Sequence, residues 1–182
     1  MNTRPSPRSH GRNLLLTFLL LAVGTAPLCA ETGSPYRTYT SGQQTVFFIL
    51  PRTLKRVQPS RAVSDYTYDV TCNTTNDSIS VTGTIETASA LPNDSVSIHF
   101  PNGTIRHYPT ERLYADLHGH NTRYRICFYI PAHEFRRIYE DTTPAMFNFG
   151  DRLNFSFSRS KWKKECEQMN AILRIFEVNT KH

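Results

Sequence analysis

The sequence lacks any apolar run long enough to cross a lipid bilayer. Its two longest apolar stretches are Leu14–Val23 and Thr45–Leu50. Both are shorter than the roughly 20 residues that a membrane-spanning helix needs. We therefore expect no direct membrane span in the mature chain. Any attachment to a membrane would then depend on a partner.

Signatures of catalysis and of metal binding are also missing. The chain has no Gly-x-Ser-x-Gly nucleophile elbow and no Cys-x-x-Cys pair. His118 and His120 could offer two imidazoles to a metal, but no residue supplies a third ligand at a suitable spacing. We interpret both as surface loop histidines. We expect no enzyme activity, no catalytic residue, no metal site and no cofactor.

A clustered basic face, which nucleic-acid binding usually requires, is scarcely represented. The formal net charge is +6, but Arg4, Arg8 and Arg12 lie in the first 30 residues, where no acidic residue occurs. The remainder has 18 basic and 15 acidic residues, a mildly basic balance. One dense basic run, Arg159–Lys164, is typical of a solvated face. We expect no nucleic-acid partner.

The N-terminal 30 residues have the pattern of a secretory signal peptide. Three arginines precede the apolar core Leu14–Val23, and the small residue Ala30 stands at the expected cleavage position. We assign residues 1–30 as the signal peptide. The mature chain is then expected to enter the secretory pathway, where disulfides form and asparagines are glycosylated.

Few cysteines remain after such a cleavage. Cys29 leaves with the signal peptide, and Cys72, Cys127 and Cys166 stay, an odd number. Cys127 and Cys166 bracket a segment with strand, helix and strand patterns, and we predict a disulfide between them. Cys72 is then left over. It is either a buried reduced thiol or the site of an intermolecular bridge.

Five Asn-x-Ser/Thr sequons follow the signal peptide, and four of them lie between residues 73 and 102. We expect a solvent-facing, glycosylated middle region, with partner surfaces elsewhere. The predicted glycosylation sites are Asn73, Asn76, Asn93, Asn102 and Asn154.

Alternating apolar and polar residues predict a β-rich α+β fold of small antiparallel sheets with one or two short helices. The expected strands are 44–50, 66–71, 78–85, 95–100, 104–108, 122–130 and 152–158, the first of them ended by Pro51. A short helix follows Pro131, with Phe135, Ile138 and Tyr139 on its apolar face. Residues 109–119 are ambiguous. The tail is expected to be helical to about Met169 and a strand after it.

An immunoglobulin-like sandwich is a second possible architecture. Cys72 and Cys127 have a tolerable separation for its bridge between the sheets. However, the single tryptophan, Trp162, lies downstream of both cysteines, and Arg125 stands where the corner tyrosine would be. Such a domain would be identified by a Cys72–Cys127 disulfide.

Several segments resemble one viral family. They are Thr122-Arg-Tyr-x-x-Cys127, Glu134–Tyr139, Arg152–Ser156 and Cys166, with weaker similarity in Thr45–Pro51, the region from Cys72 and Asn102–Pro109. Together they resemble the chemokine-like small subunit of the cytomegalovirus (betaherpesvirus) pentameric entry complex, which is built on glycoproteins H and L. In that family the N-terminal half is chemokine-like and the C-terminal half is β-rich. Phe47–Pro51 stands where the family has its first cysteine.

The resemblance implies a non-catalytic viral glycoprotein on the virion envelope that determines which host cells the virus enters. Its partners would be glycoproteins H and L, other small subunits and a host cell-surface receptor. The domains would be a possibly chemokine-like half, 31–110, and a C-terminal half, 111–182. An alternative is a free secreted immune-modulating binder, either a chemokine mimic or a decoy.

Aromatic residues and arginines are enriched at the centres of protein interfaces. On this ground we chose six candidate partner contacts, which are Tyr124, Tyr129, Arg136, Arg137, Tyr139 and Trp162.

Overall fold

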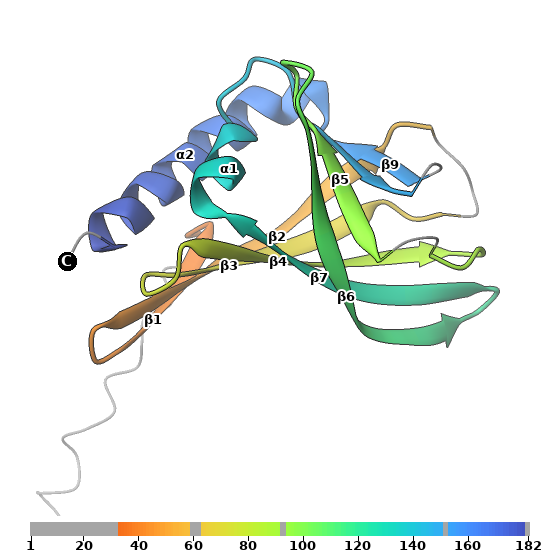
Figure 1. The fold of residues 1–182 in the computed structure, drawn as a ribbon, viewed down its shortest axis with the longest axis horizontal. Helices are drawn as coiled ribbons and strands as arrows, with labels where there is room; N and C mark the ends of the chain where they lie inside the picture. Colours follow the sequence, from red (N-terminus) through yellow and green to blue (C-terminus); the bar gives the residue numbers. More distant parts are fainter. Residues whose placement is uncertain (1–32, 59–62, 92–93, 151–152, 181–182) are drawn as a thin grey trace, which may run out of the picture. The chain divides into compact units, whose positions relative to one another are not determined.

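The described residues form a closed antiparallel sheet with two helices (Figure 1). The computed structural model describes residues 33–58, 63–91, 94–150 and 153–180. The predicted signal peptide and the sequon at Asn93 lie outside these residues. The β-rich α+β class is confirmed.

The elements follow one another along the chain in a simple order. They are β1 (Tyr36–Ser41), β2 (Gln44–Arg56), β3 (Tyr66–Asn73), β4 (Ser78–Thr87), β5 (Ser95–His99), β6 (Ile105–His118), β7 (Asn121–Pro131), α1 (Ala132–Arg137), β8 (Met146–Phe149), β9 (Leu153–Ser156) and α2 (Arg159–Thr180).

Eight strands close into a barrel in the order β2-β3-β4-β7-β6-β5-β8-β9, and β9 pairs back onto β2. Strand β1 lies outside this ring and pairs with the first half of β2, on the edge opposite β3, where β9 pairs farther along at Lys55 and Arg56. All these pairings are antiparallel. The predicted division into halves 31–110 and 111–182 is wrong, because residues 33–182 form one unit and the boundary falls inside β6. Strand β5 of the first half lies between β6 and β8, so strands of the two halves are interspersed around the ring.

Strand β2 continues through Pro51, where the sequence predicted that it would end. The pairing of β2 with β3 shifts register between Ile49 and Arg52, and β1 has already finished opposite Ile49. A proline lacks the N–H that a central strand must donate, so it is tolerated at such an irregularity. Beyond the shift, Lys55 and Arg56 pair with β9 and close the ring.

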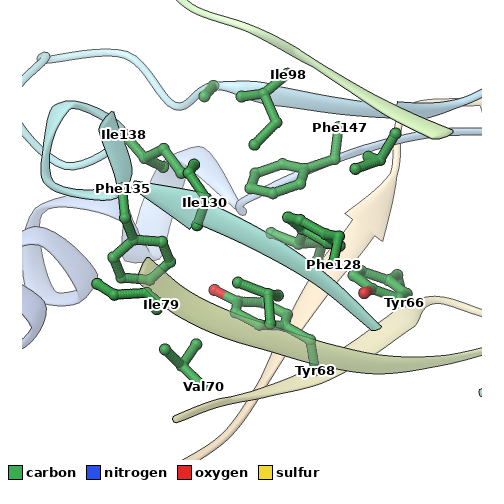
Figure 2. Close-up of a cluster of buried hydrophobic side chains, with 14 of the residues drawn as sticks. Tyr66, Tyr68, Val70, Ile79, Ile98, Phe128, Ile130, Phe135, Ile138 and Phe147 are labelled. Carbon is green, nitrogen blue, oxygen red and sulfur yellow. The ribbon is translucent and has the colours of Figure 1, made fainter. Parts of the chain in front are cut away.

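The core lies inside the ring and follows the alternation predicted for the strands. In β4, Ile79, Val81 and Ile85 are buried, whereas Ser80, Thr82 and Thr84 are partly exposed. Figure 2 shows one cluster of buried side chains to which β3, β4, β5, β7, β8 and α1 all contribute. The inward position at Gly83 holds no side chain, and the ring of Tyr66 packs over it.

The helices cover one end of this core. Phe135, Ile138 and Tyr139 are buried as predicted, and the Tyr139 and Tyr68 hydroxyls lie 3.2 Å apart. In α2, Trp162 stacks on Tyr139 with a centroid separation of 5.7 Å, while Phe176 meets Phe47 edge-on at 5.8 Å. These aromatic contacts fix both ends of α2 against the strands.

Three local predictions need correction. The tail remains helical to Thr180, because Met169, Ile172, Leu173 and Phe176 recur every three or four residues and bury one helical face. The segment 109–119, which the sequence left ambiguous, is part of strand β6 as far as His118, and most of its residues are exposed. Strand β8 was not predicted at all.

Candidate interaction surface

The outer face of the sheet, opposite the core, carries a row of neighbouring side chains that we call the outer row. Phe48 of β2 pairs with Thr71 of β3, which pairs with Ser80 of β4, which in turn pairs with Tyr129 of β7. Phe48 is 46% and Tyr129 56% exposed. The two rings thus stand at either side of a floor of short hydroxyl side chains.

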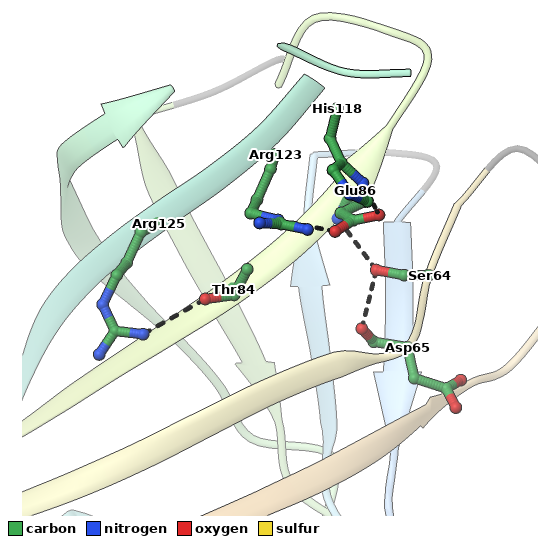
Figure 3. A network of polar contacts seen from close by, with 7 residues as sticks. All are labelled: Ser64, Asp65, Thr84, Glu86, His118, Arg123 and Arg125. Atoms are coloured by element: carbon green, nitrogen blue, oxygen red, sulfur yellow. Dashed lines mark hydrogen bonds and ion pairs between the residues drawn. The ribbon is translucent and has the colours of Figure 1, made fainter. Parts of the chain in front are cut away.

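Ion pairs hold the strands together beside this row. Arg125 of β7 donates from Nη2 to both carboxylate oxygens of Asp69, at 2.9 and 3.1 Å. It also donates from Nη1 to Thr84 Oγ1 at 3.3 Å, the contact that Figure 3 shows. A guanidinium that spans three strands in this way fixes the register of the sheet. The floor of the outer row is therefore rigidly placed.

A second polar cluster forms around Glu86 near the end of β4. Arg123 Nε donates to Glu86 Oε1 at 2.7 Å, and His118 Nδ1 lies 3.3 Å from Oε2. The Glu86 backbone N–H donates to Ser64 Oγ at 2.9 Å (Figure 3). The hydrogen bond from Arg123, and to a smaller degree that from His118, lowers the pKa of the Glu86 carboxyl. The cluster ties the end of the β6–β7 hairpin to β4.

That hairpin carries further exposed apolar side chains on both of its faces, and we call this group the hairpin surface. Leu113, Tyr114 and Leu117 are exposed, Leu117 by 84%. Strand β5 pairs with β6 only as far as Pro109, so within the described chain Glu111–His118 pair with β7 alone. Exposed apolar side chains beside an unpaired strand edge are typical of places where another chain adds to a sheet.

The six predicted contact residues divide into core and surface. Tyr124, Tyr139 and Trp162 are buried core residues, so for them the prediction of a partner contact is wrong. Arg136 and Arg137 are half-buried; Arg136 pairs with Glu140 and Glu177, and the guanidinium of Arg137 lies over Phe100. Tyr129 alone among the six is an exposed aromatic. Residue type suggested interfaces but did not distinguish them from the core.

The predicted Cys127–Cys166 disulfide is not formed, because all three described cysteines are free. Cys127 lies on the outer side of β7, within 3.3 Å of Ser80 Oγ, whereas α2 packs against the inner side of the sheet through Phe47. Cys166 belongs to α2, so the sheet separates the two thiols. The Cys72–Cys127 bridge expected of an immunoglobulin-like domain is absent as well. Cys72 is completely buried, as expected of a reduced core thiol.

These positions predict different reactivities toward an alkylating reagent. Burial raises the pKa of the Cys72 thiol to about 12, which leaves very little of the reactive thiolate at neutral pH. We expect Cys166 to be modified in the folded protein. Cys72 and Cys127 should react at least roughly 100-fold more slowly until denaturant is added. Mass spectrometry of peptides after timed labelling measures these rates, and rapid labelling of Cys72 would contradict the fold.

The sequons occupy two kinds of position. Asn76 and Asn102 are exposed in turns, and Asn73 is half-buried at the end of β3. The Asn102 Oδ1 accepts a hydrogen bond from the Thr104 N–H at 2.9 Å. Asn154 lies within β9, and its Oδ1 is buried without a hydrogen-bond partner. The fold presents Asn73, Asn76 and Asn102 far better than it presents Asn154.

The described residues offer no cluster of three or more His, Cys, Asp or Glu side chains that could hold a metal ion. His118 is the last residue of β6 and pairs with Glu86, whereas His120 lies in the turn between β6 and β7. Among the helices of the described segments, none has the length and apolar character needed to cross a membrane.

No protein-family model, curated protein or solved structure matches this chain. The comparisons therefore neither support nor exclude the viral resemblance of its sequence.

Proposed function

We propose that this chain is a non-catalytic subunit of a viral envelope entry complex that helps to determine host-cell tropism. It assembles with glycoproteins H and L and other small subunits, and the complex binds a host receptor. The observation that carries the proposal is the exposure of Phe48 and Tyr129 on a rigid, ion-paired sheet face. Exposed aromatics on such a face favour docking of another protein.

The hairpin surface supports the same proposal independently. An assembly subunit needs more than one contact, since it must join its neighbours and present the complex to a receptor. The outer row lies on β2, β3, β4 and β7 and the hairpin surface on β6, and none of their residues is a predicted glycosylation site. Asn73, at the end of β3, lies two residues beyond Thr71 on the same face, so a glycan there would border the outer row at its β3 side. Glycans block nearby protein contacts, so the absence of a predicted site from β6 and β7 is consistent with docking at Tyr129 and at the hairpin surface.

Coprecipitation from mammalian cells tests this proposal. The chain is coexpressed with candidate glycoproteins H and L and their small subunits, with Phe48→Glu, Tyr129→Glu or the control Val178→Glu. Val178 is also an exposed apolar residue, 63% exposed, but lies near the end of α2. We expect at least about tenfold weaker capture for the first two variants, because a buried charge replaces an aromatic anchor. Equal capture of all variants would contradict the outer row as a docking surface.

A free secreted binder, either a chemokine mimic or a decoy, is the second candidate. It is favoured by the closed core of residues 33–182, which contains helices and strands in one unit and requires no second chain to complete the ring. Size-exclusion chromatography with light scattering decides between the two. A stable, well-secreted monomer that captures no viral glycoprotein supports the free binder and contradicts the entry subunit.

Secretion also leads to a prediction about glycan occupancy. Replacing Asn102 with glutamine should remove one N-linked glycan from the secreted chain, because Asn102 lies in an exposed turn. Replacing Asn154 should leave the mass of the attached glycans unchanged, because Asn154 lies within β9 and its side-chain amide oxygen is buried. Intact-mass spectrometry before and after enzymatic deglycosylation measures both. A glycan lost with Asn154→Gln would show that this sequon is used before β9 pairs.

A further inference from the structure

The beginning of α2 has an unusual charge. Its first turn contains no acidic residue, and Arg159, Lys161, Lys163 and Lys164 are all exposed. A helix N-terminus carries the positive end of the helix dipole, so cations in the first turn are unfavourable there. Local patterns that oppose the stability of an element occur preferentially at functional sites. An anion bound beside this turn would reverse the penalty.

A pocket of about 350 Å³ lies beside this turn. Lys55 and Arg56 come to it from the end of β2, Arg159 comes from α2, and Ser156 adds a hydroxyl from β9. Its remaining lining residues are Val57, Thr143, Pro144, Met146 and Phe157, so none of the described residues that line it carries a carboxylate. Lys55 is paired with Asp65 outside the lining, and Arg56 and Arg159 have no ion-pair partner among the described residues. Two such guanidinium groups in one small pocket favour an anionic ligand.

Arg56 provides an observation that is independent of the helix. Its Nε and Nη1 atoms are buried, and neither has a hydrogen-bond partner. A guanidinium withdrawn from water without acceptors is costly, and native proteins usually supply a partner. The neighbouring Asp65 pairs with Lys55 and accepts a hydrogen bond from the Arg56 backbone N–H, so it is engaged by groups other than the Arg56 guanidinium. The missing acceptors of Arg56 are of the kind that a sulfate or phosphate provides.

Arg159 also lines a second, larger pocket of about 650 Å³ on the other side of the turn. Lys163 and Arg174 line it with Arg159, and Asp141 and Glu167 are the two acids there. The cations therefore continue from one pocket to the next across the first turns of α2. Such a continuous arrangement suits a chain of several anionic groups better than a single small ion.

We propose that the start of α2, with the end of β2, binds the sulfate groups of a sulfated polysaccharide. This inference rests on the proposed function, since sulfated polysaccharides are the polyanions that an extracellular protein meets at cell surfaces. A single-stranded nucleic acid is less suited to the site. The aromatic residue of the basic run, Trp162, is only 3% exposed, so it offers no ring for base stacking.

Heparin fragments serve as the probe, with the full secreted chain. The test variants are Arg159→Gln/Lys163→Gln and, separately, Arg56→Gln. The control is Arg37→Gln/Arg112→Gln, which removes the same charge as the double variant from two other exposed arginines. We expect each test variant to bind heparin at least about tenfold more weakly and the control to change affinity less than about twofold. Thermal unfolding of each variant confirms that it is folded, and Arg56→Lys, which keeps the charge, should retain more affinity than Arg56→Gln.

Three results would overturn the polysaccharide site. They are equal weakening by the control and test variants, equally tight binding of desulfated heparin, and equally tight binding of single-stranded DNA. The first would indicate a response to net charge alone. The assay needs no viral partner, so its failure leaves the coprecipitation result for Phe48 and Tyr129 unaffected. A chain that captures no viral glycoprotein in the coprecipitation would instead contradict the proposed function, whatever its affinity for heparin.

Discussion

Replacing Gly83 with alanine is expected to lower the free energy of unfolding by about 3 kcal/mol or more. Gly83 occupies an inward position of β4, and a Cβ there would overlap atoms at the tip of the Tyr66 ring. That ring is fully buried and stacked on Tyr68, and it also contacts Phe149 and Phe155. It therefore has little freedom to move aside. Chemical denaturation of the purified secreted protein measures the effect.

The matched control is Thr82→Ala, one residue earlier on the same strand. The Thr82 side chain lies on the outer, partly exposed face, so its loss should change stability by less than about 0.5 kcal/mol. A double-mutant cycle then isolates the cause. In a Tyr66→Leu background, which lacks the ring tip, Gly83→Ala should cost clearly less than in the wild type. An equal cost in both backgrounds would show that the ring is not responsible.

The strands with strict alternation were predictable because their signal is local. Residues 78–85, 122–130 and 153–157 each place apolar side chains at every second position, and the structure buries these positions. The pattern cannot say which strands pair. The order that brings β7 between β4 and β6 depends on contacts between distant residues, and it removed the expected boundary at residue 110.

The misassigned elements show where the local signal was insufficient. In the tail, Ile172, Phe176 and Val178 alternate closely enough to resemble a strand, but burial of Met169 and Leu173 on the same side selects the helix. Strand β8 has only four residues, too few for a periodic pattern. Strand β6 lacks alternation beyond Thr110, because neither face of its outer half is covered.

The candidate surface was only partly predictable for a related reason. Tyr124 and Tyr129 lie on the same strand, five residues apart, and therefore point to opposite faces of the sheet. Deciding which face is the core requires the position of α2 and the closure of the ring. Phe48 was missed because Thr45–Leu50 looked like a fully buried strand, whereas β2 exposes every second residue at this point. The disulfide predicted for Cys127 was wrong because Cys127 is buried on the outer face of the sheet, whereas Cys166 lies in α2 on the inner side.

Trp162→Ala is expected to cost about 3–5 kcal/mol of stability, although the sequence suggested that this residue contacts a partner. The indole stacks on Tyr139 and contacts Phe157 with a centroid separation of 4.8 Å, and its Nε1–H donates to the Asp141 carbonyl oxygen at 3.0 Å. Truncation would leave a cavity between α2 and α1 and an unpaired carbonyl. The helix would lose the contact that fixes its N-terminal half.

Two further variants separate a core role from a contact role. Trp162→Phe keeps a ring in the stack and loses the hydrogen bond, so it should cost about 1–2 kcal/mol. Lys164→Ala, on an exposed position two residues later, should leave stability within about 0.5 kcal/mol of the wild type. Denaturation midpoints and secreted yields are measured with and without the proposed partners. A Trp162→Ala protein with wild-type stability but lost capture would restore the contact hypothesis. A loss of stability that is present without any partner assigns Trp162 to the core, and it leaves Phe48 and Tyr129 as the aromatic anchors through which docking should be tested.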